Sequence, residues 1–120
     1  MSKISKSDET IIAEIEEQTG VSYDPDTEKV EFTGVDSDTE QYISLVEYLV
    51  ENKYIKKSDL PISASRAQTR YLINSTATHE DRDMVRPHKV GDGVYLETNH
   101  DSESKARYSG RFIQDYVLNG

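Results

Sequence analysis

Two segments in the first half of the chain carry apolar residues at helical spacing. Ile11, Ile12 and Ile15 lie on one face of residues 7–20, which begin with a serine and end with a glycine, as many helices do. Residues 37–52 carry a broader apolar face behind a Ser-Asp-Thr-Glu capping box. This spacing predicts two amphipathic helices, the second of which ends between residues 52 and 57.

Other segments alternate between apolar and polar residues, as strands do. Residues 21–33 predict a hairpin, because two alternating runs flank an Asp-Pro-Asp-Thr turn. Residues 69–74 and 93–98 predict two further strands, and a short extended segment is expected around Arg86-Pro87. These strands form the expected sheet of the second half.

The C-terminal segment predicts a third helix, which Asp101 or Ser102 is placed to cap. Its buried stripe is expected from Ala106, Phe112, Ile113, Tyr116 and Val117. The predicted fold class is therefore α+β. An acidic helix–hairpin–helix N-terminal half precedes a second half with a small antiparallel sheet backed by a C-terminal helix.

A break in the pattern separates the two halves. Proline disfavours helix in the residue before it, so Ser58-Asp59-Leu60-Pro61 ends the second helix, and residues 61–67 are mostly small and polar. We expect a boundary or hinge there. The predicted units are residues 1–60, a docking or oligomerisation segment, and residues 66–120, a DNA-reading segment.

Charge distinguishes the two halves more than composition does. The chain has 120 residues and a net charge of −9. Residues 1–60 hold 15 acidic and 6 basic side chains, all lysines, whereas residues 61–120 hold 8 of each sign and all six arginines. Arginine presents a planar fork suited to phosphates and base edges. The acidic half is expected to be either a solvated face or a surface for a basic partner.

Several function classes are excluded or disfavoured by the sequence. There is no cysteine, and no stretch approaches the roughly 20 apolar residues of a membrane span, so a cytoplasmic protein without a membrane partner is expected. The spacing of His79, His88 and His100 does not resemble a metal pair. We expect no enzyme, no metal, no cofactor and no small-molecule substrate.

One nuclease-like pattern remains as an alternative. Pro25-Asp26 followed by Glu51-Asn52-Lys53 has the form found in many metal-dependent DNA-cleaving enzymes. That chemistry needs the second motif on a strand beside the aspartate. Here it falls at the end of a predicted helix, which disfavours cleavage.

Three segments of the second half share features with a known family. These are Thr69-Arg70-Tyr71, Arg86-Pro87-His88-Lys89-Val90 and Gly93-Val94-Tyr95-Leu96-Glu97-Thr98-Asn99, followed by a helix start rich in Ser, Lys and Arg. Together they resemble the C-terminal DNA-binding domain of the SeqA replication modulator family. That family recognises hemimethylated GATC sites through a Thr-Asn loop in the major groove. The resemblance implies sensing of modified, methylated duplex DNA.

The chain departs from this family at two points. Asp101 stands where the family's loop has a second asparagine, and an acidic segment replaces the family's N-terminal dimerisation unit. A carboxylate at that position repels phosphate. The resemblance therefore supports binding of duplex DNA more strongly than it supports GATC as the target sequence.

The residues themselves suggest how such a loop reads DNA. An asparagine amide makes a bidentate hydrogen bond to adenine in the major groove, and basic side chains on phosphates set the register. The alternative for Asn99 is a loop-closing Asx turn. For Arg107 and Arg111 it is a solvated helix face, with the two arginines paired with Glu103 and Asp115. The expected DNA-binding residues are Thr98, Asn99, His100, Arg66, Arg70, Arg86, Lys89, Lys105 and Arg107.

The competing hypothesis is a protein-interaction module. Its acidic first half binds a basic partner or mimics the charge of nucleic acid. Tyr42, Tyr48 and Tyr54 are spaced six residues apart, so they cannot all share the buried face of one helix. At least one is expected to stay exposed beside carboxylates, where an aromatic ring suits a protein contact.

Overall fold

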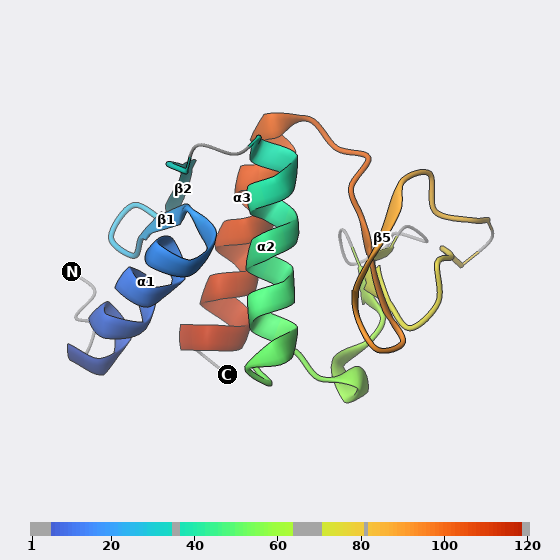
Figure 1. The fold of residues 1–120 in the computed structure, drawn as a ribbon, viewed down its shortest axis with the longest axis horizontal. Coiled ribbons are helices and arrows are strands. Elements are labelled where there is room, and N and C mark those ends of the chain that lie inside the picture. The colour runs from blue at the N-terminus through green and yellow to red at the C-terminus, as the bar shows by residue number, and fades with distance from the viewer. Residues whose placement is uncertain (1–5, 35–36, 64–70, 81, 119–120) are drawn as a thin grey trace.

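Three layers follow one another along the longest axis of the molecule in the computed structural model, which describes residues 6–34, 37–63, 71–80 and 82–118 (Figure 1). Helix α1 and a hairpin form the first layer, helices α2 and α3 the second, and a four-stranded sheet the third. The predicted α+β class is thus confirmed. The elements are α1 (Lys6–Thr19), β1 (Val21–Asp24), β2 (Lys29–Phe32), α2 (Asp38–Glu51), β3 (Ile62–Ser63), β4 (Tyr71–Asn74), β5 (Pro87–Gly91), β6 (Val94–Glu97) and α3 (Ser102–Phe112), with a 3₁₀ turn η1 (Lys57–Asp59) and a π-helical end η2 (Ile113–Leu118).

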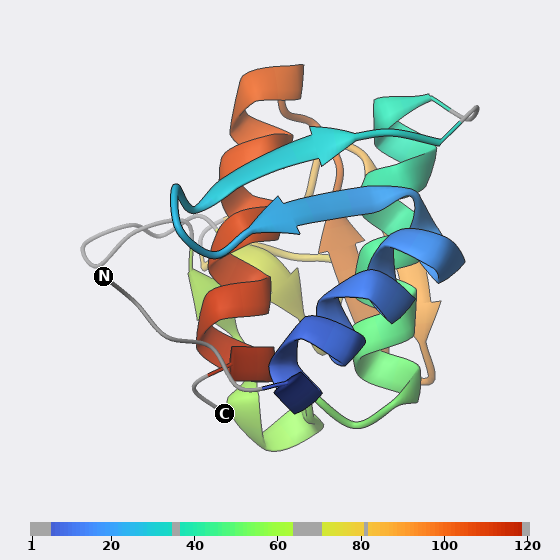
Figure 2. The same cartoon turned by 90° about the vertical axis from the view of Figure 1, so that its left-hand side faces the viewer.

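The first layer forms as its sequence predicts. Gly20 ends α1 with a φ of 80°, a left-handed conformation that glycine adopts without steric cost. Strands β1 and β2 then pair antiparallel, with Val21 opposite Phe32. The hairpin lies across the two central helices (Figure 2).

Helix α2 is the central element of the core. The Ser37 hydroxyl caps it by accepting a hydrogen bond from the Glu40 N–H at 3.1 Å, as the capping box predicts. The helix ends at Glu51 with Asn52 as its C-cap, one residue before the expected interval. Its buried residues are Gln41, Tyr42, Leu45, Val46 and Leu49.

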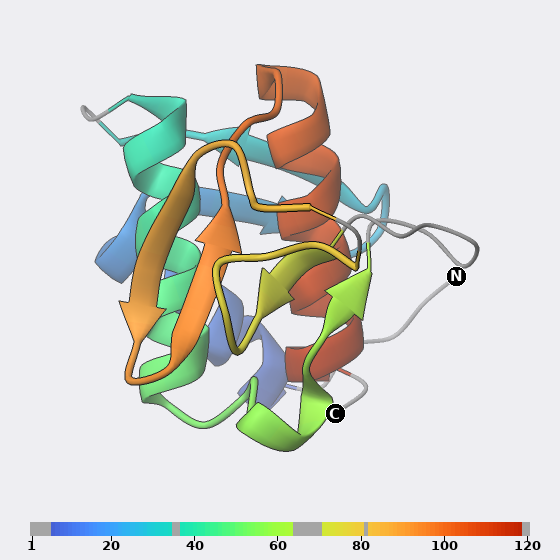
Figure 3. The same cartoon turned by 90° about the vertical axis from the view of Figure 1, so that its right-hand side faces the viewer.

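The sheet has the strand order β3-β4-β6-β5 and is antiparallel throughout. Ile73 lies opposite Leu96, and both are fully buried. One face of the sheet covers α2 and α3, as Figure 3 shows. Successive residues of a strand point to opposite faces, so Glu97 faces away from the side that Leu96 occupies. His79, Val85 and Arg86, from the loop after β4, contact Glu97 on that second face.

The described part of the expected hinge contributes to this sheet. Ile62 and Ser63 form the edge strand β3, which pairs with β4. Residues 64–67 lie outside the described part of the chain, as do Arg66 and the Thr69-Arg70 start of the predicted strand. Strand β4 itself begins at Tyr71.

One hydrophobic core joins the two segments predicted as separate units. Tyr42 from α2 stacks on Phe112 from α3, with ring centroids 6.2 Å apart. Ile15 and Val21 belong to the same buried cluster as Leu96. The described residues of segments 1–60 and 66–120 therefore contribute to one hydrophobic core.

Helix α3 follows its prediction with one change in the buried face. The Asp101 carboxylate caps it by accepting from the Ser104 N–H at 2.7 Å. Phe112, Ile113 and Val117 are buried as expected, whereas Ala106 and Tyr116 are half-buried. Lys105 and Ser109 complete the buried stripe.

The three tyrosines of α2 and its exit differ in burial, as their spacing requires. Tyr42 is fully buried, while Tyr48 and Tyr54 are half-buried and stack with centroids 6.4 Å apart. Neither of the two is fully exposed. They cover the core from outside and leave part of each ring accessible.

No helix in the described residues is long and apolar enough to cross a membrane.

The buried Tyr42 hydroxyl has no hydrogen-bond partner among the described residues. Burying an unsatisfied hydroxyl costs about 1–3 kcal/mol, so we expect Tyr42→Phe to raise the free energy of unfolding by about 1 kcal/mol. Tyr42→Ala leaves a cavity in the core, so we expect it to lower the free energy of unfolding by about 3–5 kcal/mol. Urea unfolding of both variants measures these values, with Tyr48→Phe as the half-buried control. A loss of stability in Tyr42→Phe contradicts the assignment of an unpartnered hydroxyl.

Candidate nucleic-acid interface

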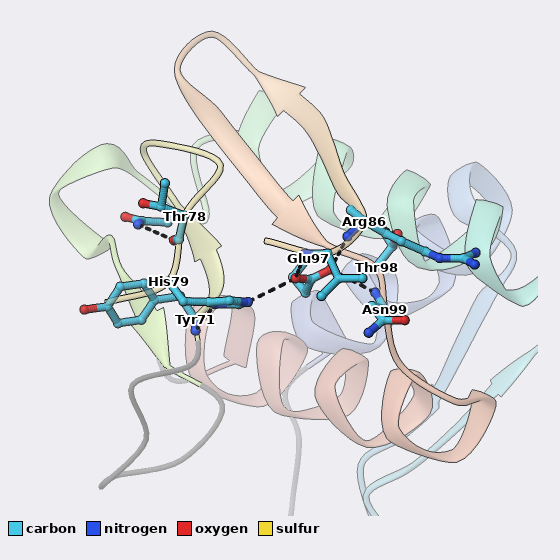
Figure 4. Close-up of polar contacts among 9 residues, drawn as sticks. Tyr71, Thr78, His79, Arg86, Glu97, Thr98 and Asn99 are labelled. Carbon is cyan, nitrogen blue, oxygen red and sulfur yellow. Dashed lines mark hydrogen bonds and ion pairs between the residues drawn. The ribbon is translucent and has the colours of Figure 1, made fainter. Parts of the chain in front are cut away.

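A buried carboxylate at the end of β6 organises the loops at one edge of the sheet. The Glu97 side chain is only 2% exposed. Its Oε2 accepts a hydrogen bond from the Val85 N–H at 2.8 Å, and its Oε1 accepts from the N–H groups of Arg86 at 2.8 Å and Asn99 at 3.2 Å. One side chain thereby holds two loops that are distant in sequence (Figure 4).

His79 supplies the fourth hydrogen bond to this carboxylate. Its Nε2 lies 3.1 Å from Glu97 Oε2, and its Nδ1 accepts a hydrogen bond from the Tyr71 N–H at 2.9 Å. An accepting Nδ1 carries no proton, so this geometry assigns the neutral tautomer with the proton on Nε2. His79 therefore donates to Glu97 and connects β4 to β6.

The surroundings of Glu97 favour its ionised form. Burial by itself raises the pKa of this carboxyl, but the N–H groups of Arg86, Val85 and Asn99, together with His79, outweigh it and lower the pKa below the ordinary 4.5. The carboxylate is thus a permanent acceptor at neutral pH. Its donors come from both loops, so the charge is stabilised only when the loops are in place.

The Thr-Asn loop and Arg86 are also joined directly. The Thr98 N–H and hydroxyl both donate to the Arg86 carbonyl, at 3.0 and 2.8 Å. Arg86 and Asn99 have exposed side chains, and among the described residues the Asn99 amide has no hydrogen-bond partner. The Asx turn weighed as the alternative for Asn99 is therefore absent there. Figure 4 shows Arg86, Thr98 and Asn99 side by side.

His100 occupies a different position from the rest of its loop. It is half-buried, and its ring lies edge-on to Tyr108 at 5.0 Å and to Tyr42 at 6.4 Å between centroids. The predicted role was a DNA contact beside Asn99. The ring instead packs toward the core and fixes the path from β6 into α3.

Lys105 is similarly held inside the fold. Its side chain is 8% exposed, and its Nζ lies 2.7 Å from Thr39 Oγ1 and 3.8 Å from Asp38 Oδ1. The Ser102 hydroxyl donates to the other oxygen of Asp38, and this bond, with the Lys105 charge, lowers the Asp38 pKa. The ammonium predicted to contact phosphate thus joins the starts of α2 and α3.

The remaining basic candidates differ in their distance from the loop. Lys89 is exposed on β5, three residues after Arg86, and lies opposite Tyr95. Arg107 is exposed on α3, with its guanidinium carbon 5.3 Å from the centre of the Tyr108 ring. Arg66 and Arg70 lie outside the described residues. The structure therefore brings together Arg86, Thr98 and Asn99, and places Lys89 on the adjoining strand.

The helix-face pairs predicted for α3 are present in part. Arg111 Nε lies 3.9 Å from Asp115 Oδ2, and its Nη2 donates to the Ser63 carbonyl at 2.7 Å. No ion pair joins Arg107 to Glu103 in the part of the chain that the structure describes. Arg107 therefore keeps its charge available at the surface.

Glu97 and His79 are the residues that the sequence analysis missed. Strand alternation places Glu97 on the face opposite Leu96, which by itself predicts an exposed carboxylate. Its burial accompanies the hydrogen bonds that it accepts from His79, Val85 and Arg86 in the loop after β4. That loop is held by bonds of its own, from the Asn74 amide to the Thr78 carbonyl and from the Met84 N–H to the Ala77 carbonyl. No local pattern marks that loop as a cover for the sheet.

The exposed carboxylates of the first layer lie far from this loop, whereas Glu80, Asp83, Asp101 and Glu103 are exposed close to it in the chain. The molecule is 41 Å long, with α1 and the hairpin at one end and the sheet at the other (Figure 1). Exposed charges are screened over a Debye length of about 8 Å at physiological ionic strength. The exposed carboxylates of α1, β1, β2 and their turn are Glu9, Glu14, Glu16, Glu17, Asp24, Asp26, Glu28 and Glu31.

The described residues contain no group of three or more side chains suited to hold a metal ion.

Comparison of the chain with protein-family models, with curated proteins and with solved structures finds no match.

Replacing Glu97 tests its role as the anchor of the two loops. Glu97→Gln puts an amide N–H₂ among N–H donors, so we expect it to lower the free energy of unfolding by about 2–3 kcal/mol at pH 7. Urea unfolding measures the change, and Glu31→Gln on exposed β2 is the matched control, expected within about 0.5 kcal/mol of wild type.

The pH dependence of that difference gives an independent readout. Because the folded-state pKa of Glu97 is lowered, its stabilising contribution is complete above the ordinary value of 4.5 and is lost as the pH falls through the folded-state pKa. Wild type and Glu97→Gln should therefore converge in stability toward the acid end of a series from pH 7 to pH 3. A difference that stays constant over this range contradicts an ionised anchor.

Proposed function

We propose that this protein is a small, non-enzymatic DNA-binding module that contacts duplex DNA through Arg86, Thr98 and Asn99. The observation that carries the proposal is the arrangement around Glu97. Its carboxylate holds the backbone of Arg86 and Asn99, while both side chains remain exposed. A free amide and a free guanidinium are thus presented together from fixed backbone.

The chemistry of this pair suits DNA. The amide of Asn99 matches the N6 and N7 edge of adenine, and the guanidinium of Arg86 matches a phosphate. Because hydrogen bonds to Glu97 and to the Arg86 carbonyl hold the loop, little backbone order remains to be gained on binding. The protein therefore loses less entropy on binding than a mobile loop does.

Electrostatics are compatible with this contact despite the net charge of −9. The acidic layer lies at the far end of the long axis, beyond the range of strong interaction at physiological salt. Lys89 provides further exposed positive charge on β5, whereas Arg107 lines a pocket with Tyr23 and Glu28 of the hairpin. With two or three phosphate contacts, log K should fall with log salt concentration by a slope of about 2 to 3.

The proposal extends to the methylation of adenine. A methyl group on N6 lies on the edge that the Asn99 amide would contact, and the resemblance of residues 69–99 to the SeqA family supports this specificity. We further propose that the protein acts in the cytoplasm.

Duplex binding by two loop variants tests the proposal. Fluorescence anisotropy would use GATC-containing duplexes, unmethylated and hemimethylated, at 50 and 200 mM salt. Asn99→Ala should remove discrimination worth about 1–3 kcal/mol between the duplexes and leave non-specific binding. Arg86→Ala should weaken binding to both duplexes and lower the salt slope by about one. Lys29→Ala, on exposed β2, is the charge-matched control. Absence of binding by wild type at the lower salt concentration rejects the proposal.

Asp101 offers a gain-of-binding variant. Asparagine caps helices as well as aspartate does, so Asp101→Asn should keep the cap on Ser104 and the stability of α3. It removes a negative charge two residues from Asn99. We therefore expect tighter duplex binding with unchanged thermal unfolding, measured by anisotropy and circular dichroism. Unchanged affinity would place the DNA away from this loop.

A second candidate is contact between the acidic layer and a basic protein segment. The half-buried Tyr48–Tyr54 pair supports it, because burial first and the Glu14 charge second raise the pKa of the Tyr48 phenol. Acidic and aromatic groups thus lie together, as a surface for a basic partner requires. Three results together favour this candidate. Wild type binds a lysine-rich peptide, Glu14→Gln binds the same peptide more weakly, and wild type does not bind duplex DNA.

A further inference from the structure

A small pocket lies at the opposite end of the β5–β6 hairpin from the Thr-Asn loop. It has a volume of about 300 Å³ and is bounded by the C-terminal end of α2, by η1 and by the β5–β6 turn. Its apolar lining is formed by Val50, Ile55, Leu60 and Val94. Ile55 and Val94 are 2% and 3% exposed, so they form the pocket's floor. This volume is at the lower end of the range for small-molecule sites.

Three lysines surround the apolar floor. Lys53, Lys56 and Lys57 line the pocket and are all exposed, and Asp92 is the one carboxylate among its lining residues. None of the three ammonium groups makes an ion pair within the described residues. The local charge of the lining is therefore +2 in a chain whose net charge is −9.

The backbone around the pocket positions these lysines. Gly93 has a φ of 68°, and a Cβ at this residue would lie only 3.4 Å from Lys57 Nζ. The ammonium of Lys57 thus rests against the β5–β6 turn at the edge of the pocket. The Lys56 N–H donates to Asp59 Oδ2 at 2.8 Å, which fixes the turn η1 that carries both lysines.

The end of α2 does not itself need these side chains as caps. The Lys53 N–H donates to the Val50 carbonyl at 3.2 Å, and the Tyr54 N–H donates to the Leu49 carbonyl at 2.8 Å. Backbone groups thereby satisfy these carbonyls of the last helical turn. The ammonium groups remain available to a ligand.

We propose that this pocket binds a small organic monoanion with an apolar body, of the class of a medium-chain monocarboxylate. The apolar body replaces water over Ile55 and Val94, and the carboxylate is neutralised by the surrounding ammonium groups. An inorganic anion makes only the charge interaction with the lysines. An uncharged apolar molecule makes only the apolar contact with the pocket's floor. A nucleic-acid duplex is excluded by size, because the apolar floor lies inside a pocket of about 300 Å³.

The site is separate from the proposed DNA contact. Strand β6 runs from Val94, in the pocket, to Glu97, at the Thr-Asn loop, a length of about 10–13 Å. The proposal therefore stands or fails independently of DNA binding.

Three probes separate the two interactions. Octanoate combines an apolar body with a carboxylate, inorganic phosphate supplies charge alone, and 1-octanol supplies the apolar body alone. Each is titrated into the full chain while backbone amide shifts are followed by NMR. Octanoate should shift the amides of Ile55, Gly93 and Val94 saturably, with a Kd of about 1 mM for a ligand of this size. Phosphate and 1-octanol should bind at least about tenfold more weakly.

A pair of matched lysine variants completes the test. Lys57→Gln should weaken octanoate binding by about tenfold, because it removes the ammonium that lies against Gly93. Lys29→Gln, also an exposed lysine but on β2, should leave the Kd unchanged. Any one of three results would overturn the proposal. These are no saturable shifts at the pocket amides, phosphate binding as tight as octanoate binding, or an unchanged octanoate Kd in Lys57→Gln.

Discussion

Hydrogen bonding to the ionised carboxylate of Glu97 is the interaction on which one edge of the sheet depends. A charge in a nearly dry environment is tolerated only when its oxygens are hydrogen-bonded. Here the donors are His79, Val85, Arg86 and Asn99, drawn from two loops and from no regular element. If either loop left its place, the carboxylate would lose part of its hydrogen bonds, so one side chain links both loops to this edge of the sheet.

A second polar junction determines where that edge sits relative to the helices. Lys105 reaches across to Thr39 and Asp38 at the start of α2, while His100 packs between Tyr42 and Tyr108. These contacts hold the N-terminal end of α3 against α2. The Thr-Asn loop lies directly before that end, so it is held on one side by Glu97 and on the other by α3.

The layered arrangement also separates surfaces of different charge. The acidic hairpin layer and the sheet lie on opposite sides of α2 and α3 (Figure 1). Within the sheet layer, the free amide and guanidinium lie at one end of β6 and the lysine-lined pocket at the other. A chain with a single small core thus presents three chemically distinct surfaces. Their separation follows from the order of the elements and needs no domain boundary.

The sequence by itself determined the elements, because caps, turns and hydrophobic period are local properties. The Ser37 cap, the hairpin at residues 21–33, the glycine end of α1 and the Asp101 cap were all predicted from neighbouring residues. Arg86 and Asn99 were also named from the sequence as expected DNA-binding residues, and both are exposed, as their polarity predicts. The burial of Glu97, His79, His100 and Lys105 was decided by tertiary structure alone. Each is polar, and polarity by itself predicts exposure; only the partners brought close by the folded chain make their burial favourable.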